Sequence, residues 1–259
     1  MSRSDCANAS HWRAIIATLL TTMVASRAWA VDEIQVYNAD IAEPGQFTFQ
    51  QHLNYVWQGS TTPDFPGGFA SNRTLNGTPE LAYGVAPWYE LGFYLPFAFD
   101  ADGTFLPGGA KFRQLFVSPH AEQRKFFYGL NIELSYQSPR FSQDPIGLEL
   151  RPILGVRDIG WEFIINPIVD FSFGGPGSSA FAPAARLAHN VGGDIWIGLE
   201  YYSAYSPFGV IPAPDQQQHT LFAVTDFTVL GLDVNFGMGF GLTGSSDGLV
   251  TKIIIGKAF

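Results

Sequence analysis

Ser203 and His219 are the residues of this sequence whose types and spacing come nearest to those of a hydrolase. Both have outward parity in their predicted strands, and they lie symmetrically about Ile211 of the connection 206–216, so a regular hairpin places them nearly opposite each other. A serine becomes a nucleophile when a histidine accepts its proton and a third group orients that histidine. No outward Asn, Asp or Glu lies nearby in the pattern. Lipid hydrolysis through this pair is therefore one hypothesis. The other is that Ser203 and His219 are polar residues that lie at the boundary with the lipid headgroups and have no catalytic role.

Most other chemistry-bearing residues are carboxylates and bases that alternate with large apolar side chains. In 160–173, GWEFIINPIVDFSF, one register holds Glu162, Asn166 and Asp170, whereas the other is aromatic and aliphatic. Such alternation predicts a β-strand with one apolar face, which meets either a core or lipid.

About twelve alternating segments of this kind follow one another, separated by turn residues. They cover 45–58, 78–86, 88–100, 109–118, 125–138, 145–156, 159–173, 179–190, 193–205, 217–229, 231–243 and 248–259. Strands of about ten residues with a dyad repeat, joined alternately by long and short connections, are typical of a transmembrane barrel. The sequence therefore predicts an all-β fold, a transmembrane antiparallel up-and-down β-barrel of about twelve strands over 45–259. Because 109–118 and 179–190 alternate poorly, ten strands remain the alternative.

The apolar rows are expected to face lipid, because the lumen of a barrel of about twelve strands is too wide for them to fill. The opposite register should then line the lumen. It comprises Glu80, Glu90, Lys111, Arg113, Glu133, Glu149, Arg151, Glu162, Asn166, Asp170, Arg186, Asp194, Glu200, Asp233 and Lys252. Acidic side chains outnumber basic ones in this set. Two interpretations stay open: a water-filled pore that favours cations, and a closed lumen whose carboxylates and bases pair.

Aromatic residues near the two ends of the strands predict two girdles at the membrane interfaces. The outer set is Tyr55, Trp57, Phe97, Phe99, Tyr136, Phe171, Phe173, Tyr201 and Tyr205. The inner set is Trp88, Tyr89, Phe126, Phe127, Trp161, Phe227 and Phe259.

The two ends of the chain predict export and insertion into a membrane. Residues 1–30 resemble a secretory signal peptide, with Arg3 and Arg13 before the short apolar run 14–26 and Ala28-Trp29-Ala30 as the cleavage site. Residues 31–44 are acidic and precede the first strand as an N-terminal periplasmic segment, which either hangs free or folds into the lumen as a small plug. The chain finishes on Phe259, the C-terminal aromatic through which we expect contact with the barrel-assembly machinery. The predicted location is the outer membrane of a Gram-negative bacterium.

Several function classes are excluded or left without support by composition. The only cysteine, Cys6, lies before the predicted cleavage site, so no disulfide is expected. A net charge of −9 without a basic patch argues against nucleic-acid binding. No spacing of His, Cys or Asp indicates a metal site, and no cofactor is expected. The expected partners are outer-membrane lipid and an unidentified small solute.

Four stretches carry a resemblance to a known family: PELAYGVAPWYELGFYLPF (79–97), GLNIELSYQ (129–137), GLELRPILGVR (147–157) and WEFIINPIVDFS (161–172). They resemble the outer-membrane transporters grouped under the phenol meta-cleavage pathway, over roughly residues 45–259. The resemblance implies a barrel that admits small compounds, aromatic ones among them, and carries no functional residue with it. The acidic inward register departs from a dedicated channel for apolar solutes. The primary functional hypothesis is thus a passive, porin-like channel or transporter, with a closed structural barrel or a lipid hydrolase as alternatives.

Overall fold

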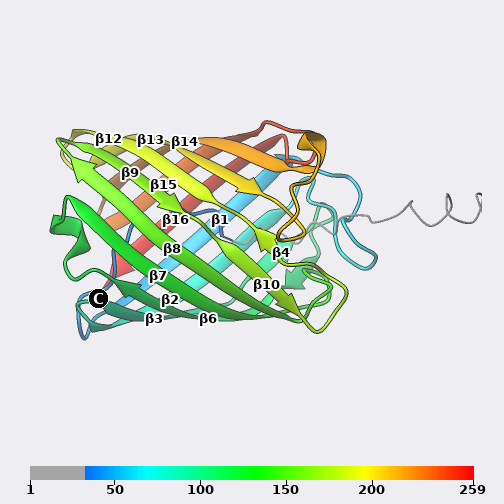
Figure 1. The fold of residues 1–259 in the computed structure, drawn as a ribbon, viewed down its shortest axis with the longest axis horizontal. Helices are drawn as coiled ribbons and strands as arrows, with labels where there is room; N and C mark the ends of the chain where they lie inside the picture. The colour runs from blue at the N-terminus through cyan, green and yellow to red at the C-terminus, as the bar shows by residue number, and fades with distance from the viewer. Residues whose placement is uncertain (1–32) are drawn as a thin grey trace, which may run out of the picture.

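The computed structural model describes residues 33–259, and these form a closed antiparallel β-barrel of 12 strands (Figure 1). Every consecutive pair of barrel strands is hydrogen-bonded, and β1 (Phe47–Gln58) pairs with both β2 (Leu75–Ala86) and β16 (Leu249–Ala258), which closes the sheet. The predicted all-β architecture is confirmed. The predicted signal peptide lies outside the described residues.

Four of the barrel strands are built from two pieces each, one of which, β5 (Phe105–Pro107), lies in the predicted connection 101–108. Their successive pieces are β3 (Tyr89–Tyr94) with β4 (Phe97–Phe99), β5 with β6 (Gly109–Val117), β9 (Trp161–Asn166) with β10 (Val169–Phe173), and β11 (Ala180–Phe181) with β12 (Ala184–Gly192). Three of the breaks contain Pro96, Pro167 or Pro183, and proline removes the backbone donor that a sheet needs. The pieces nevertheless follow one line, since β3 and β4 both pair with β2 and β9 and β10 both pair with β8.

The remaining barrel strands are continuous. They are β7 (Phe126–Gln137), β8 (Ile146–Asp158), β13 (Ile195–Ala204), β14 (Gln218–Val229) and β15 (Leu232–Gly241), and two 3₁₀ turns, η1 (Ala121–Gln123) and η2 (Pro214–Gln216), lie in connections. All twelve predicted segments form strands, including 109–118 and 179–190. The second segment starts earlier than predicted, at Leu75, because Leu75, Asn76 and Gly77 pair with β1 on one side and β4 on the other.

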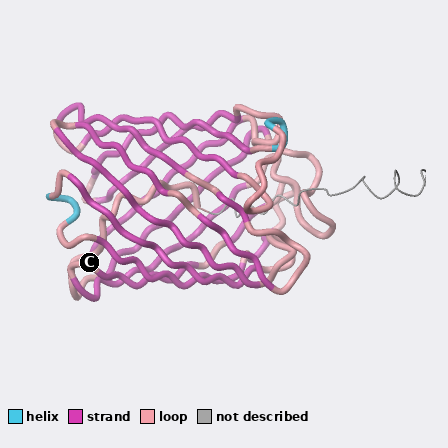
Figure 2. Tube along the Cα trace, in the orientation of Figure 1, coloured by secondary structure: helices cyan, strands magenta, loops and turns pink. Residues whose placement is uncertain are grey.

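The connections differ between the two ends of the barrel, as the sequence predicts (Figure 2). At one end, the short-turn end, the strands are joined by 87–88, 118–125, 159–160, 193–194 and 230–231. At the other, the long-loop end, they are joined by 59–74, 100–104, 138–145, 174–179, 205–217 and 242–248. Leu230-Gly231 and Ile159-Gly160 have positive φ angles, so each pair has the backbone of a tight hairpin turn.

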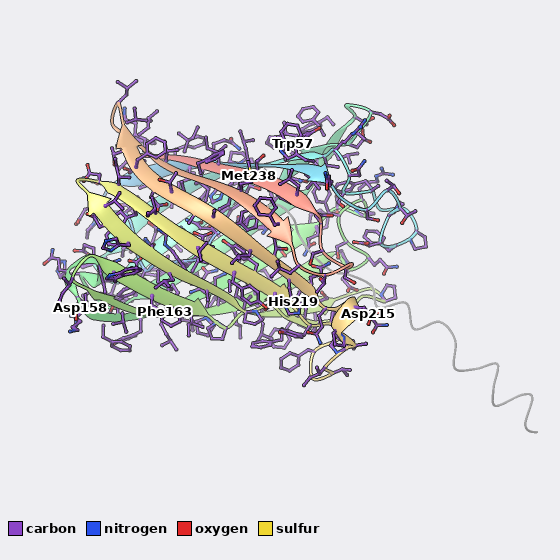
Figure 3. The ribbon with its side chains drawn as sticks, turned by 90° about the horizontal axis from the view of Figure 1, so that it is seen from above. Trp57, Asp158, Phe163, Asp215, His219 and Met238 are labelled. Atoms are coloured by element: carbon purple, nitrogen blue, oxygen red, sulfur yellow. The ribbon has the colours of Figure 1, made fainter. Side chains whose placement is uncertain are left out.

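The outside of the barrel is apolar. Phe163 and Met238 lie on this surface in Figure 3, and they are 47% and 40% exposed. Leu81, Phe112, Leu134, Leu154, Ile197, Leu199 and Phe236 are likewise exposed. A continuous apolar belt of this extent around a closed barrel is the surface that a lipid bilayer requires. The barrel is therefore a membrane-spanning one.

No helix within residues 33–259 is long and apolar enough to cross a membrane.

One member of the predicted inner girdle is misplaced. Phe127 is fully buried inside the barrel, where the Arg157 guanidinium lies 4.8 Å from its ring centroid. The strand alternation accounts for this, since Phe126 faces outward and its neighbour must face inward. Trp88, Phe126, Trp161 and Phe259 are all exposed near the short-turn end.

Candidate functional site: the barrel lumen

The described part of the predicted periplasmic segment 31–44 lies inside the barrel. Together with Gly45 and Gln46 it forms what we call the lumenal segment, residues 33–46. It runs from Glu33, whose carboxylate is 4.0 Å from Lys111 Nζ, to Gly45, whose N–H donates to the Gly84 carbonyl near the short-turn end. A Cβ at Gly84 would lie 2.3 Å from the Glu43 carbonyl oxygen, so glycine is needed where the segment leaves the lumen.

The residues predicted from alternation to line the lumen fall in three groups. Those with buried side chains are Glu80, Glu90, Lys111, Arg113, Glu133, Arg151, Glu162, Asn166, Arg186, Glu200 and Lys252. Glu149 and Asp170 are partly exposed and line a cavity toward the long-loop end. Asp194 and Asp233 are exposed and line a larger cavity toward the short-turn end.

The first buried ion-pair network is centred on Arg113 of β6. Its Nη2 lies 2.7 Å from a Glu80 oxygen and also pairs with Glu90. His52 of β1 reaches the second Glu80 oxygen at 3.2 Å. Charge-assisted bonds of this kind offset the loss of hydration that burial imposes on each group.

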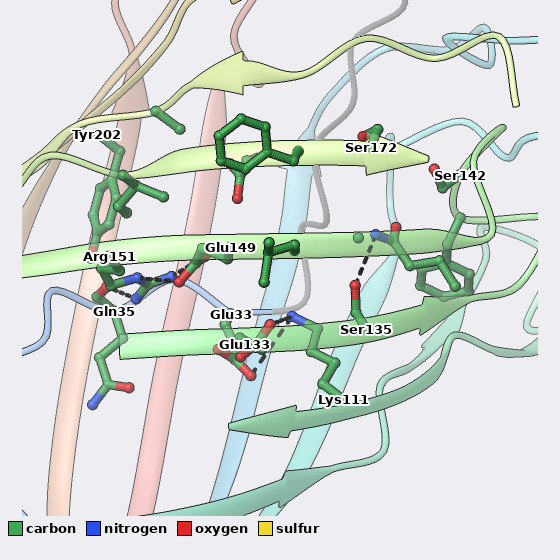
Figure 4. A pocket seen from close by; sticks show the side chains of 18 residues that line it. Glu33, Gln35, Lys111, Glu133, Ser135, Ser142, Glu149, Arg151, Ser172 and Tyr202 are labelled. Carbon is green, nitrogen blue, oxygen red and sulfur yellow. Dashed lines mark hydrogen bonds and ion pairs between the residues drawn. The ribbon is translucent and has the colours of Figure 1, made fainter. Parts of the chain in front are cut away.

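A second set of pairs lies on β6, β7 and β8, around the cavity drawn in Figure 4. Lys111 Nζ lies 3.1 Å from Glu133, and the Arg151 guanidinium donates to both oxygens of Glu149 at 2.7 and 2.8 Å. Each base thus has a carboxylate on its own or the neighbouring strand.

A third network crosses β9, β12, β13, β14 and β16. Arg186 pairs with Glu162 at 3.4 Å, with Glu200 at 2.8 Å and with Asp226. Lys252 Nζ is 2.5 Å from the other Glu200 oxygen, which also accepts from the Tyr202 hydroxyl. Sequence reasoning missed Asp226, because Phe222 and Val224 share its inward face and hide the alternation.

The two acids nearest the short-turn end differ from these networks. Within residues 33–259, Asp194 and Asp233 take part in no ion pair, and Asp233 accepts only from the Thr228 hydroxyl at 3.0 Å. An uncharged partner leaves the formal charge of the carboxylate in place. Asp194 and Asp233 therefore place negative charge at that mouth without a base in ion-pair distance.

The larger cavities beside the lumenal segment lie toward both ends of the barrel. Two lie toward the long-loop end, with volumes of about 110 and 80 Å³, and we call them the outer cavities. The third, the inner vestibule, has about 450 Å³ and is lined by Asp194, Asp226, Asp233 and residues 38–43 of the segment. Gln35 lines both the larger outer cavity and the inner vestibule, so the segment separates them.

The candidate hydrolase pair is brought together in register but not in side-chain contact. Ser203 and His219 are direct partners across β13 and β14. The Ser203 hydroxyl donates to the Pro183 carbonyl at 3.1 Å, and the two nitrogens of His219 face the Tyr201 hydroxyl and Gln217 Oε1. The imidazole is thus engaged elsewhere, and the structure gives no support to lipid hydrolysis here. Within the described part of the chain, no group of His, Cys, Asp and Glu side chains is arranged to hold a metal ion.

Comparison with known proteins gives similar folds only. No protein-family model and no curated protein matches the chain. An outer membrane channel from Pseudomonas putida F1 superposes with a TM-score of 0.61 at 12% identity, over 88% of this chain and all (100%) of that one. The NanC porin superposes with a TM-score of 0.51 at 6% identity, over 82% of this chain and 98% of that one. At such low identities the likeness shows that this chain has the fold of an outer-membrane barrel.

Proposed function

We propose that this protein is a passive channel for small solutes in the bacterial outer membrane, with its short-turn end in the periplasm. The observation that carries the proposal is a lumen lined by charged side chains, with cavities at both ends, inside a wall whose outer face is apolar. A polar interior behind an apolar exterior is the arrangement of a barrel that conducts water-soluble molecules. The names of the two similar structures, a channel and a porin, support the same function and location.

The resemblance to transporters grouped under the phenol meta-cleavage pathway supports small aromatic compounds as solutes. The larger outer cavity combines Phe141 and Tyr202 with charged groups, which suits a ring that carries a polar substituent. Delivery to the membrane through a signal peptide cleaved after Ala30, and recognition of Phe259 by the assembly machinery, belong to the same proposal.

A closed structural barrel is the second candidate, because the lumenal segment and the paired charges fill much of the interior. Planar-bilayer conductance of the refolded mature chain, measured in a salt gradient, distinguishes the two. A channel should give steady, cation-favouring current. Absence of current from protein shown to be folded would favour the structural barrel, and uptake of small phenols into vesicles would be the next test.

A further inference from the structure

The lumenal segment is held by side chains that come from strands around the whole barrel. Lys252 of β16 donates to the Ile34 carbonyl at 2.9 Å, and Arg151 of β8 donates to the Gln35 carbonyl at 3.2 Å. Glu90 of β3 accepts from the Ala42 N–H at 2.6 Å. Because these strands lie on different sides of the barrel, the segment is suspended across the lumen and does not lie along one wall.

Tyr37 contacts the barrel wall through its backbone, its ring and its hydroxyl. Asn166 of β9 accepts from the Tyr37 N–H at 2.7 Å and donates to the Tyr37 carbonyl at 3.1 Å, so one amide satisfies both backbone groups. Such two-point bonding reproduces the pairing of a neighbouring strand. The residue is only 4% exposed.

The Tyr37 ring also joins two of the ion-pair networks. The Arg151 and Arg113 guanidinium groups lie 4.2 and 5.6 Å from its ring centroid, and its hydroxyl is 3.0 Å from that of Tyr94. Cations gain energy over an aromatic ring, more so where water is excluded. The ring therefore fills the space between Arg113 of β6 and Arg151 of β8.

We propose that the lumenal segment is the size-selecting constriction of the channel and that Tyr37 is its specificity-determining residue. The proposal rests on the channel function above. Tyr37 and Gln35 border the inner vestibule and Gln35 also borders the larger outer cavity, so a solute moving between these spaces must pass the segment at this level. Removing the ring joins the cavities, whereas removing a segment side chain without a wall partner leaves them separate.

The test compares Tyr37→Ala and Asn166→Ala with Asn38→Ala. Asn38 is the matched control, since its side-chain bonds go only to Asp40 within the segment. Single-channel conductance should rise at least about twofold in the first two variants, and liposome swelling should extend to larger uncharged solutes. The double variant should conduct at least as well as either single variant, because Tyr37→Ala removes the ring contacts to Arg151 and Arg113, whereas Asn166→Ala removes the bonds to the Tyr37 backbone.

The outcomes separate this inference from the proposed function. If folded Tyr37→Ala and Asn166→Ala conduct like the wild type with the same solute cut-off, the inference is wrong while the channel function stands. If folded wild type and both variants all fail to conduct, both proposals fail. If the wild type is closed and a variant conducts, the inference is supported. Should Tyr37→Ala not fold, Asn166→Ala and Tyr37→Phe, which loses only the hydroxyl contact, decide the question; Tyr37→Phe should keep the wild-type cut-off.

Discussion

The middle of the lumen and the inner vestibule differ in whether their carboxylates have basic partners. In the middle, Arg113, Arg186 and Lys252 each face at least one buried carboxylate within ion-pair distance. The Arg113 network lies where this region borders the inner vestibule, and its side chains are buried. In the inner vestibule, Asp194 and Asp233 are exposed and lack a basic partner among the described residues. The difference teaches that negative charge contributes to stability where it is paired, and is available to act on ions where it is not.

Burial explains why the two regions diverge. A charge removed from water costs several kcal/mol, so the middle of the lumen tolerates carboxylates only as members of networks. Next to bulk water a carboxylate keeps its hydration and needs no partner. Substitutions in the two regions should therefore change different properties.

The largest effect is expected from Arg113→Ala, which leaves Glu80 and Glu90 buried without their shared cation. Removing one partner of a buried network typically costs about 3–5 kcal/mol. Urea-induced unfolding of the refolded barrel measures it. Lys125→Ala is the control, because its pair with Asp158 is exposed at the short-turn end, and pairs of that kind contribute about 0–1 kcal/mol. If Arg113→Ala and Lys125→Ala lost equal unfolding free energy, burial would not determine how much an ion pair contributes to stability.

Lys252→Met should have an intermediate effect. Glu200 keeps Arg186 and the Tyr202 hydroxyl as partners, so its charge stays compensated. The Ile34 carbonyl of the lumenal segment loses a donor at the same time. We expect a loss of about 1–3 kcal/mol by the same unfolding assay. A loss as large as that of Arg113→Ala would show that Arg186 alone does not compensate Glu200.

The strands themselves were predictable because alternation is a local property. Neighbouring residues alone indicate which side of the strand faces the lumen. The structure places Glu162 and Asn166 on that side and Phe163 on the other, as the pattern indicates. Phe127 differs from the prediction, because its aromatic side chain suits an interface whereas its parity in the strand points into the lumen. The breaks at Pro167 and Pro183 were not predicted, since proline interrupts pairing without changing the path of the strand.

The contacts of the site were less predictable because they depend on residues far apart in sequence. The pairing of Arg186 with Asp226 crosses β13, which separates their strands in the sheet, and needs the register of three strands. The sequence of the lumenal segment has no periodicity from which its path could be predicted. It is set by Asn166, Arg151 and Lys252, whose inward faces alone do not indicate what they bind.

A smaller effect, on selectivity, is expected from the double variant Asp194→Asn and Asp233→Asn. Loss of two unpaired charges at one mouth should lower the cation-to-anion permeability ratio roughly two- to threefold, from about 0.5 kcal/mol at an exposed site. Unfolding free energy should change by less than about 0.5 kcal/mol. Reversal potentials in a salt gradient measure the ratio. Asp158→Asn removes a charge at the same end but outside the inner vestibule, and should leave the ratio unchanged.

The smallest effect concerns salt, and it separates the two regions without any substitution. The Debye length falls from about 10 Å at 0.1 M to about 3 Å at 1 M, so salt screens the exposed Asp194 and Asp233 far more than buried Arg113 and Glu80. At a constant concentration ratio across the bilayer, the reversal potential should move toward zero as salt rises. The urea midpoint should move little, because the buried networks are shielded from the added ions. A midpoint that falls in parallel with selectivity would mean that water and salt reach the middle of the lumen, and the contrast between paired and unpaired charge would then have to be replaced by one continuous, hydrated interior.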